Sequence, residues 1–146
     1  MPGVAKLLDH WHPENFADEL KYQRSLVEFF RERIPTDCRV EREYRHEGTT
    51  VDLYLCWSGF LSKGELFIEV KRNLNKKATL DRLVGQIETL TPGKRAIMVV
   101  LVGETNEALL GRLEERYKRL REVDFEERLA IVVKRPQAAQ PSPASG

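Results

Sequence analysis

The sequence has few cysteines, no long apolar run and no secretory signal. Its only cysteines, Cys38 and Cys56, are too few for a secreted disulfide scaffold and lack the spacing of a zinc ribbon. No segment approaches the roughly 18 apolar residues of a membrane span, and "MPGVAKLLDHWHPEN" at the start lacks the apolar core of a signal peptide. We therefore expect a soluble, cytoplasmic protein with reduced thiols and no membrane partner.

Charge of neither sign is in excess, although 32% of the residues are charged. Lysine and arginine number 24 and aspartate and glutamate 23, which leaves a formal net charge of +1. A general polyanion binder is usually more basic. The length of 146 residues suits a single domain, which we expect over residues 1–135. Residues 136–146, "PQAAQPSPASG", lack the apolar content that orders a chain and predict a disordered tail.

The hydrophobic pattern predicts helices that alternate with strands. Apolar residues at helical spacing indicate helices, alternation of apolar and polar residues indicates half-buried strands, and the apolar "AIMVVLVG" is typical of a central buried strand. The order is α-β-β-β-α-β-α-β, which predicts an α/β fold with a mixed central sheet flanked by helices. The expected elements are a helix over residues 13–34 that begins at Pro13, strands over 38–46, 49–57 and 65–71, a helix over 78–90, a strand over 96–103, a helix over 105–122 and a strand over 128–134.

Two charged residues interrupt the apolar third strand, in "ELFIEVKRNL" (residues 65–74). Because strand side chains alternate between faces, Glu69 and Lys71 share one face with Phe67, and the other face is apolar. An edge strand with a solvated polar face is the ordinary explanation of an isolated Glu-x-Lys. The same pattern also occurs at residues 19–21, inside a predicted helix. A chemical role for Glu69 and Lys71 therefore needs support from other residues.

The first predicted helix carries one carboxylate against its amphipathic pattern. Projected at about 100° per residue, Glu19 lies in the middle of the apolar stripe, whereas Glu28 lies on the opposite, solvated side. A buried carboxylate without a partner costs several kcal/mol, so we expect Glu19 to meet a metal, a cation or a water-filled cleft. Gln23, one turn further on, could line the same cleft. The alternative is a glutamate near the helix end that reaches solvent.

Asp52 is a second charged residue in an unfavourable position, because aspartate is disfavoured in strands and here lies near the start of one. A capping or turn role is the alternative explanation. If the second and third strands form a hairpin, Asp52 lies across from the end of the third strand, where Glu69 and Lys71 are. Three charged groups would then meet at one end of the sheet.

The order of these residues along the chain resembles the PD-(D/E)xK nuclease superfamily, which includes archaeal Holliday junction resolvases and small restriction and repair nucleases. The matching residues are Glu19, Asp52, Glu69, Val70 and Lys71, followed by Gln86 in the next helix. The resemblance covers residues 13–102 and implies a restriction-endonuclease-like core. Val51 stands where a proline often precedes the aspartate, and Leu90 stands where some branches have a tyrosine four residues after the glutamine.

The resemblance implies a nuclease that depends on Mg²⁺, with Mn²⁺ as a substitute, and that acts on DNA. Asp52 and Glu69 are then the expected metal ligands, joined by the backbone carbonyl of Val70, and Glu19 could hold a second ion or a metal-bound water. Lys71 would orient the attacking water or stabilise the transition state as a cation. Gln86 would be an accessory residue, with an ordinary surface glutamine as the alternative. Small nucleases without a separate reading domain often work as homodimers.

Basic residues gather after the third strand and could grip DNA phosphates, although solvated side chains explain them equally well. They are Arg72, Lys76, Lys77 and Arg82, with Lys94 and Arg95 at the far end of the helix. His10 and His12 offer two metal ligands without a third at a convincing spacing, so we do not expect zinc. The alternative function is a non-catalytic nucleic-acid-binding or subunit module that retains the nuclease fold.

Overall fold

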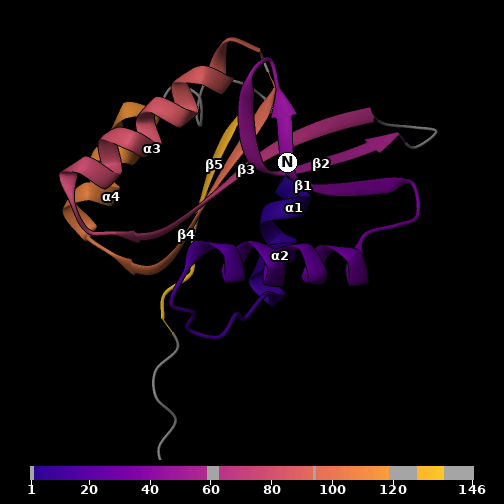
Figure 1. Ribbon diagram of the computed structural model, residues 1–146, viewed down its shortest axis with the longest axis horizontal. Helices are drawn as coiled ribbons and strands as arrows, with labels where there is room; N and C mark the ends of the chain where they lie inside the picture. Colours follow the sequence, from indigo (N-terminus) through magenta and orange to yellow (C-terminus); the bar gives the residue numbers. More distant parts are fainter. Residues whose placement is uncertain (1, 59–62, 94, 119–127, 137–146) are drawn as a thin grey trace, which may run out of the picture.

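The computed structural model describes residues 2–58, 63–93, 95–118 and 128–136, and it contains a five-stranded mixed sheet with helices on both faces (Figure 1). The α/β class and the mixed sheet predicted from the sequence are confirmed. The elements are α1 (Pro2–Leu7), the 3₁₀ turn η1 (Leu8–His10), α2 (Glu19–Arg33), β1 (Cys38–His46), β2 (Thr49–Ser58), β3 (Lys63–Leu74), α3 (Lys77–Leu90), the 3₁₀ turn η2 (Thr91–Gly93), β4 (Ala96–Thr105), α4 (Glu107–Arg116) and β5 (Leu129–Val133).

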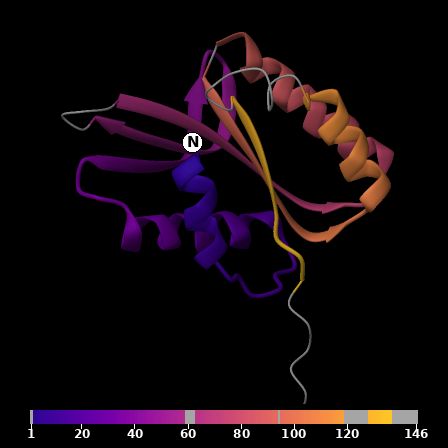
Figure 2. The same cartoon turned by 180° about the vertical axis from the view of Figure 1, so that it is seen from behind.

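The strands lie in the order β1-β2-β3-β4-β5. The first three pair antiparallel, whereas β3, β4 and β5 pair parallel. Parallel neighbouring strands require a crossover connection. The connection from β3 to β4 contains α3, and the one from β4 to β5 contains α4. Because such crossovers are right-handed, two successive ones in the same direction lie on the same face of the sheet. Accordingly, α3 and α4 lie side by side on one face, while α2 crosses the other (Figure 2).

Two apolar clusters fill the spaces between the sheet and these helices. The first packs α2 against one face and includes Leu26 and Phe30 of α2 together with strand residues such as Ile68. The second packs α3 and α4 against the opposite face and includes Phe67. Since Phe67 and Ile68 are neighbours on β3, they face opposite ways, as strand alternation requires. Glu69 therefore follows Phe67 on the face that α3 and α4 cover.

The start of α2 differs from the prediction, because the helix begins at Glu19 and not at Pro13. Asp18 is its N-cap and accepts a hydrogen bond from the backbone N–H of Lys21 at 2.8 Å. A side-chain cap of this kind satisfies a free N–H group of the first turn, which proline at residue 13 cannot do. The preceding segment folds back on the helix, where the backbone N–H of Phe16 donates to the Tyr22 hydroxyl at 3.0 Å.

Strand β3 is longer than predicted, because it continues to Leu74 through an irregularity at Asn73. Asn73 has a positive φ of 58°, and its side-chain oxygen accepts a hydrogen bond from the N–H of Glu104 at 2.9 Å. Gly103, beside it on β4, also has a positive φ, of 67°. The two strands thus stay paired across a shared bulge, which carries the chain from Lys71 to the start of α3.

The remaining boundaries agree with the prediction to within a few residues, except at α4. That helix ends at Arg116, and the residues from 119 to 122 that were expected to extend it lie outside the described part of the chain. Lys94 and most of the predicted tail, residues 137–146, also lie outside it. Among the described residues, the structure has no helix that is long and apolar enough to cross a membrane.

Candidate active site

The candidate site lies where β2 separates from β3. Pairing between these strands runs from Ser58 opposite Lys63 to Leu53 opposite Ile68 and then stops, although β3 continues to Leu74 alongside β4. We call the part of β3 beyond Ile68 that faces away from β4 its open edge. The N–H and C=O groups on this edge have no strand partner and need other hydrogen-bond acceptors and donors.

Asp52 lies where β2 ends its pairing with β3 and where one pair is missing from its ladder with β1. The register with β1 passes from Arg42 opposite Leu53 to Tyr44 opposite Val51, without a pair between Glu43 and Asp52. Glu43 has a positive φ of 54°, which interrupts the β1 backbone at this position. The interruption was not predicted, because nothing in the alternating sequence of β1 marks it. Asp52 thus has no ladder pair on either neighbouring strand.

Two carboxylates take the place of the missing strand along the open edge. Oδ2 of Asp52 accepts a hydrogen bond from the backbone N–H of Val70 at 2.8 Å, and Oε1 of Glu19 accepts one from the N–H of Arg72 at 3.0 Å. Residues 70 and 72 present their N–H groups to the same edge because strand geometry repeats every second residue. The N–H and the carbonyl of one strand residue point to the same edge, so the Val70 carbonyl also belongs to the open edge.

Glu69 forms a buried acid pair with Asp52. Its side chain is 2% exposed, and among the described residues it is the one charged side chain that is buried. The two carboxyl groups lie close enough for each to shift the pKa of the other. Burial, followed by the charge of Asp52, raises the pKa of Glu69 to about 9. Burial also raises the pKa of Asp52, although the N–H of Val70 and Lys71 oppose the shift.

Lys71 supplies the positive charge closest to this pair and lowers the pKa of both acids by its charge. Its Nζ lies 3.4 Å from Oε1 of Glu19, and the two side chains are 16% and 37% exposed. Glu19 is thus held by two contacts with β3, one to the main chain and one to Lys71. Lys71 stays partly accessible and next to the acids.

The structure brings together the four charged residues that the sequence singled out, Glu19, Asp52, Glu69 and Lys71. Gln23 is buried on α2, one turn beyond Glu19, while Glu28 is exposed, as the helical projection predicts. Gln86 is exposed on α3, and its backbone carbonyl accepts a hydrogen bond from the Thr89 hydroxyl. The structure shows no contact of the Gln86 side chain with the acid pair in the described part of the chain.

The basic residues predicted to bind phosphates are not equivalent. Arg72 is half-buried, and its Nε donates to the carbonyl of Phe16 at 3.1 Å, so it anchors the segment before α2. Arg95 lies at the other end of β3, where it pairs with Glu65 at 3.2 Å, and therefore does not join a cluster after Lys71. The exposed members are Lys76, Lys77 and Arg82.

The donor set fits a hard divalent cation. Mg²⁺ is bound in proteins by one or two carboxylates and keeps other positions for water and phosphate oxygen, and Asp52 and Glu69 provide such a pair. Two acids this close cannot both ionise without a compensating cation. Over the described ranges, no group of three or more His, Cys, Asp or Glu residues lies close enough to hold a metal by itself. His10 and His12 are both exposed.

No protein-family model matches the chain, and neither a curated protein nor a solved structure matches it. Its function must therefore be inferred from its own residues.

Proposed function

We propose that the chain is a divalent-cation-dependent nuclease of the PD-(D/E)xK type that hydrolyses phosphodiester bonds in DNA. The observation that carries this proposal is the buried acid pair of Asp52 and Glu69 beside Lys71 on the open edge of β3. Burying an acid next to another acid destabilises a fold, so such pairs are concentrated at functional sites. The order of these residues along the chain agrees with the resemblance described from the sequence.

Asp52, Glu69 and the Val70 carbonyl would hold the cation. When bound, Mg²⁺ supplies a nucleophilic water and polarises the phosphate. Asp52 is already oriented for this role, because the N–H of Val70 fixes one of its oxygens. Ionisation of Glu69, which its burial opposes, is favoured by a cation at the same position.

Lys71 and Glu19 would act on the substrate side of the pair. The ammonium group of Lys71 can donate a hydrogen bond to the attacking water or to a phosphate oxygen that gains negative charge. Glu19 keeps this ammonium group at the open edge, because its own carboxylate is fixed by the N–H of Arg72. A lysine free to rotate would lose this position.

A non-catalytic nucleic-acid-binding module is the second candidate, favoured by one observation. The carboxylates of Asp52 and Glu19 satisfy backbone N–H groups, which is a role that structure alone can explain. That role needs neither a buried Glu69 nor a lysine beside it, since neither side chain satisfies the open edge. We therefore place the catalytic function first.

The test is cleavage of a panel of labelled nucleic acids by the purified chain. Single-stranded, duplex, flap and four-way-junction DNA and their RNA counterparts would be incubated with Mg²⁺, with Mn²⁺ or with chelator. We expect cleavage of at least one DNA with either metal and none with chelator. Cleavage that continues in chelator, or of RNA alone, would contradict the proposal, and binding without cleavage would favour the second candidate.

A further inference from the structure

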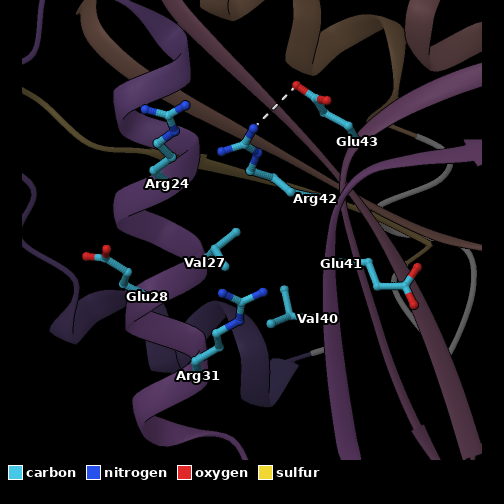
Figure 3. Close-up of a pocket in the computed structure, with 8 residues that line it drawn as sticks. All are labelled: Arg24, Val27, Glu28, Arg31, Val40, Glu41, Arg42 and Glu43. Atoms are coloured by element: carbon cyan, nitrogen blue, oxygen red, sulfur yellow. Dashed lines mark ion pairs between the residues drawn. The ribbon is translucent and has the colours of Figure 1, made fainter.

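A groove of about 580 Å³ runs between α2 and β1, the strand at the edge of the sheet (Figure 3). Its volume is within the range of small-ligand sites, although it is open to solvent along its length. Val27 of α2 and Val40 of β1 contribute apolar surface, and both belong to the core on this face of the sheet. The other lining residues are Arg24, Glu28, Arg31, Glu41, Arg42 and Glu43.

Three arginines line the groove, of which Arg24 and Arg31 are exposed and Arg42 is half-buried. Figure 3 shows the guanidinium groups of Arg31 and Arg42 reaching into the space between helix and strand, with Arg24 beside them. The carboxylates of Glu28 and Glu41 point away from that space in the same view. Arg24 and Arg31 are seven residues apart, so they lie on the same side of α2, separated by about 10 Å along its axis.

The three acidic residues that line the groove pair with few of its arginines. In the part of the chain that the structure describes, Arg24 and Arg31 form no ion pair or hydrogen bond through their guanidinium groups. Arg42 pairs with Glu43 at 3.5 Å, but its Nε is buried and has no hydrogen-bond partner. The charged lining residues are thus three arginines and three glutamates, and among them only Arg42 and Glu43 form an ion pair in the described part of the chain. An anion in the groove would give the buried Nε of Arg42 the hydrogen-bond acceptor that it lacks.

The groove begins beside the candidate active site. Arg42 is opposite Leu53, the residue that follows Asp52 on β2. Arg24 is five residues beyond Glu19, about 7.5 Å along α2 but also about 140° around it, so the groove approaches the site from the β1 side and not along one face of the helix. A polyanionic strand that crosses the open edge of β3 can thus continue between α2 and β1.

We propose that this groove binds the sugar-phosphate backbone of the DNA strand whose scissile phosphate lies at Asp52 and Glu69. The inference rests on the proposed nuclease function and adds a binding track to it. Arginine suits this role because its planar guanidinium group can donate two parallel hydrogen bonds to a phosphate. The contacts read no base, so the groove contributes affinity and orientation without sequence preference.

The experiment is fluorescence anisotropy with a labelled single-stranded DNA, in chelator so that cleavage does not interfere. The variants are Arg24→Gln, Arg31→Gln and the double change, and the matched control is Arg112→Gln. Arg112 is an exposed arginine on α4, which packs on the opposite face of the sheet. Thermal melts of each variant verify that the fold is retained.

Each groove variant should lower affinity, and each should reduce the slope of log affinity against log salt by about 0.7, the contribution of one phosphate contact to single-stranded DNA. The double variant should bind roughly tenfold or more weakly near 0.1 M salt, and Arg112→Gln should match the parent. Equal loss in all variants, or none, would overturn the inference, as would a parent chain that binds no DNA.

The two proposals fail separately. If the parent cleaves DNA but Arg24→Gln and Arg31→Gln bind DNA as the parent does, the groove does not bind the DNA backbone and the nuclease proposal stands. If the groove variants lose DNA binding while the parent cleaves no nucleic acid, the groove is a DNA-binding site and the catalytic proposal is wrong.

Discussion

The carboxylate of Asp52 accepts a hydrogen bond from the amide of Val70, 2.8 Å away, and thereby joins β2 to β3 beyond the last paired residues of the two strands. The same carboxyl group lies beside the side chain of Glu69, and each shifts the pKa of the other. Asp52 therefore has a structural contact on one side and a second acid on the other. A variant that tests the role of the charge must keep the hydrogen bond to Val70. Asparagine removes the charge and can keep this bond, whereas alanine removes both.

Replacing Asp52 by asparagine or Glu69 by glutamine should abolish tight Mn²⁺ binding and leave the chain folded. Both changes keep the shape and the hydrogen-bonding capacity but remove one of the two anionic ligands. Isothermal titration calorimetry with Mn²⁺ measures the effect, with the exposed Glu28→Gln as the control. Unchanged metal affinity in both site variants would remove Asp52 and Glu69 from the metal site.

Asp52→Ala should behave differently from Asp52→Asn in stability. Alanine leaves the N–H of Val70 without its partner, and an unsatisfied donor of this kind costs about 1–3 kcal/mol, reduced here by the partial exposure of the position. Chemical denaturation of the two variants in chelator gives the difference. Equal unfolding free energies would show that water replaces the carboxylate at no cost.

Without metal, the stability of the chain should fall as the pH rises from about 5 to about 9. The pKa of Glu69 is raised from 4.5 to about 9, so across this interval the folded state binds a proton that the unfolded state has lost. The favourable contribution is complete at low pH and disappears as the pH rises through the folded pKa. Because the pair titrates together, the change belongs to Asp52 and Glu69 jointly.

Glu69→Gln should remove most of this pH dependence and raise the unfolding free energy at pH 8 by about 1 kcal/mol or more. Urea denaturation in chelator at several pH values provides the measurement, and Glu28→Gln should keep the parent profile. A parent chain whose stability is flat or rises over this interval would contradict the buried acid pair.

The roles of the two acids Glu19 and Glu28 can be compared with the substitutions Glu19→Gln and Glu28→Gln. The two residues are nine positions apart and lie on different sides of α2. Glutamine can still accept the hydrogen bond from Arg72 but no longer attracts Lys71 electrostatically. We expect Glu19→Gln to slow cleavage about tenfold or more. Both variants should stay within about 1 kcal/mol of the parent in stability. Equal cleavage rates would reduce Glu19 to a structural contact.

Much of the fold could be predicted because its signals are local. Alternating and helical patterns gave the element order and most boundaries. The start of α2 was wrong, since the choice between Pro13 and Asp18 depends on a cap and on contacts with Tyr22 that only the folded segment makes. The extension of β3 was missed because the bulge at Asn73 is stabilised by a neighbouring strand.

The four charged residues of the site were predicted from their positions on faces and from strand order, and the structure places them together. Their catalytic roles stay predictions. The interruption at Glu43 could not be predicted, since a positive φ at a glutamate leaves no mark in the sequence. The arginine groove was missed because it combines α2 with β1. Arg72 was expected at a phosphate, but its side chain is bound to the carbonyl of Phe16.

The most direct test of the nuclease proposal is single-turnover cleavage by Lys71→Ala beside Lys63→Ala, two lysines at opposite ends of the same strand. Lys63 is exposed and distant in register from the acid pair, so its removal should leave the rate unchanged. Lys71→Ala should bind Mn²⁺ as the parent does but cleave about 100-fold or more slowly, because the lysine assists the chemical step and is not a ligand. If Lys71→Ala cleaves every accepted substrate as fast as Lys63→Ala, the proposed active site is wrong.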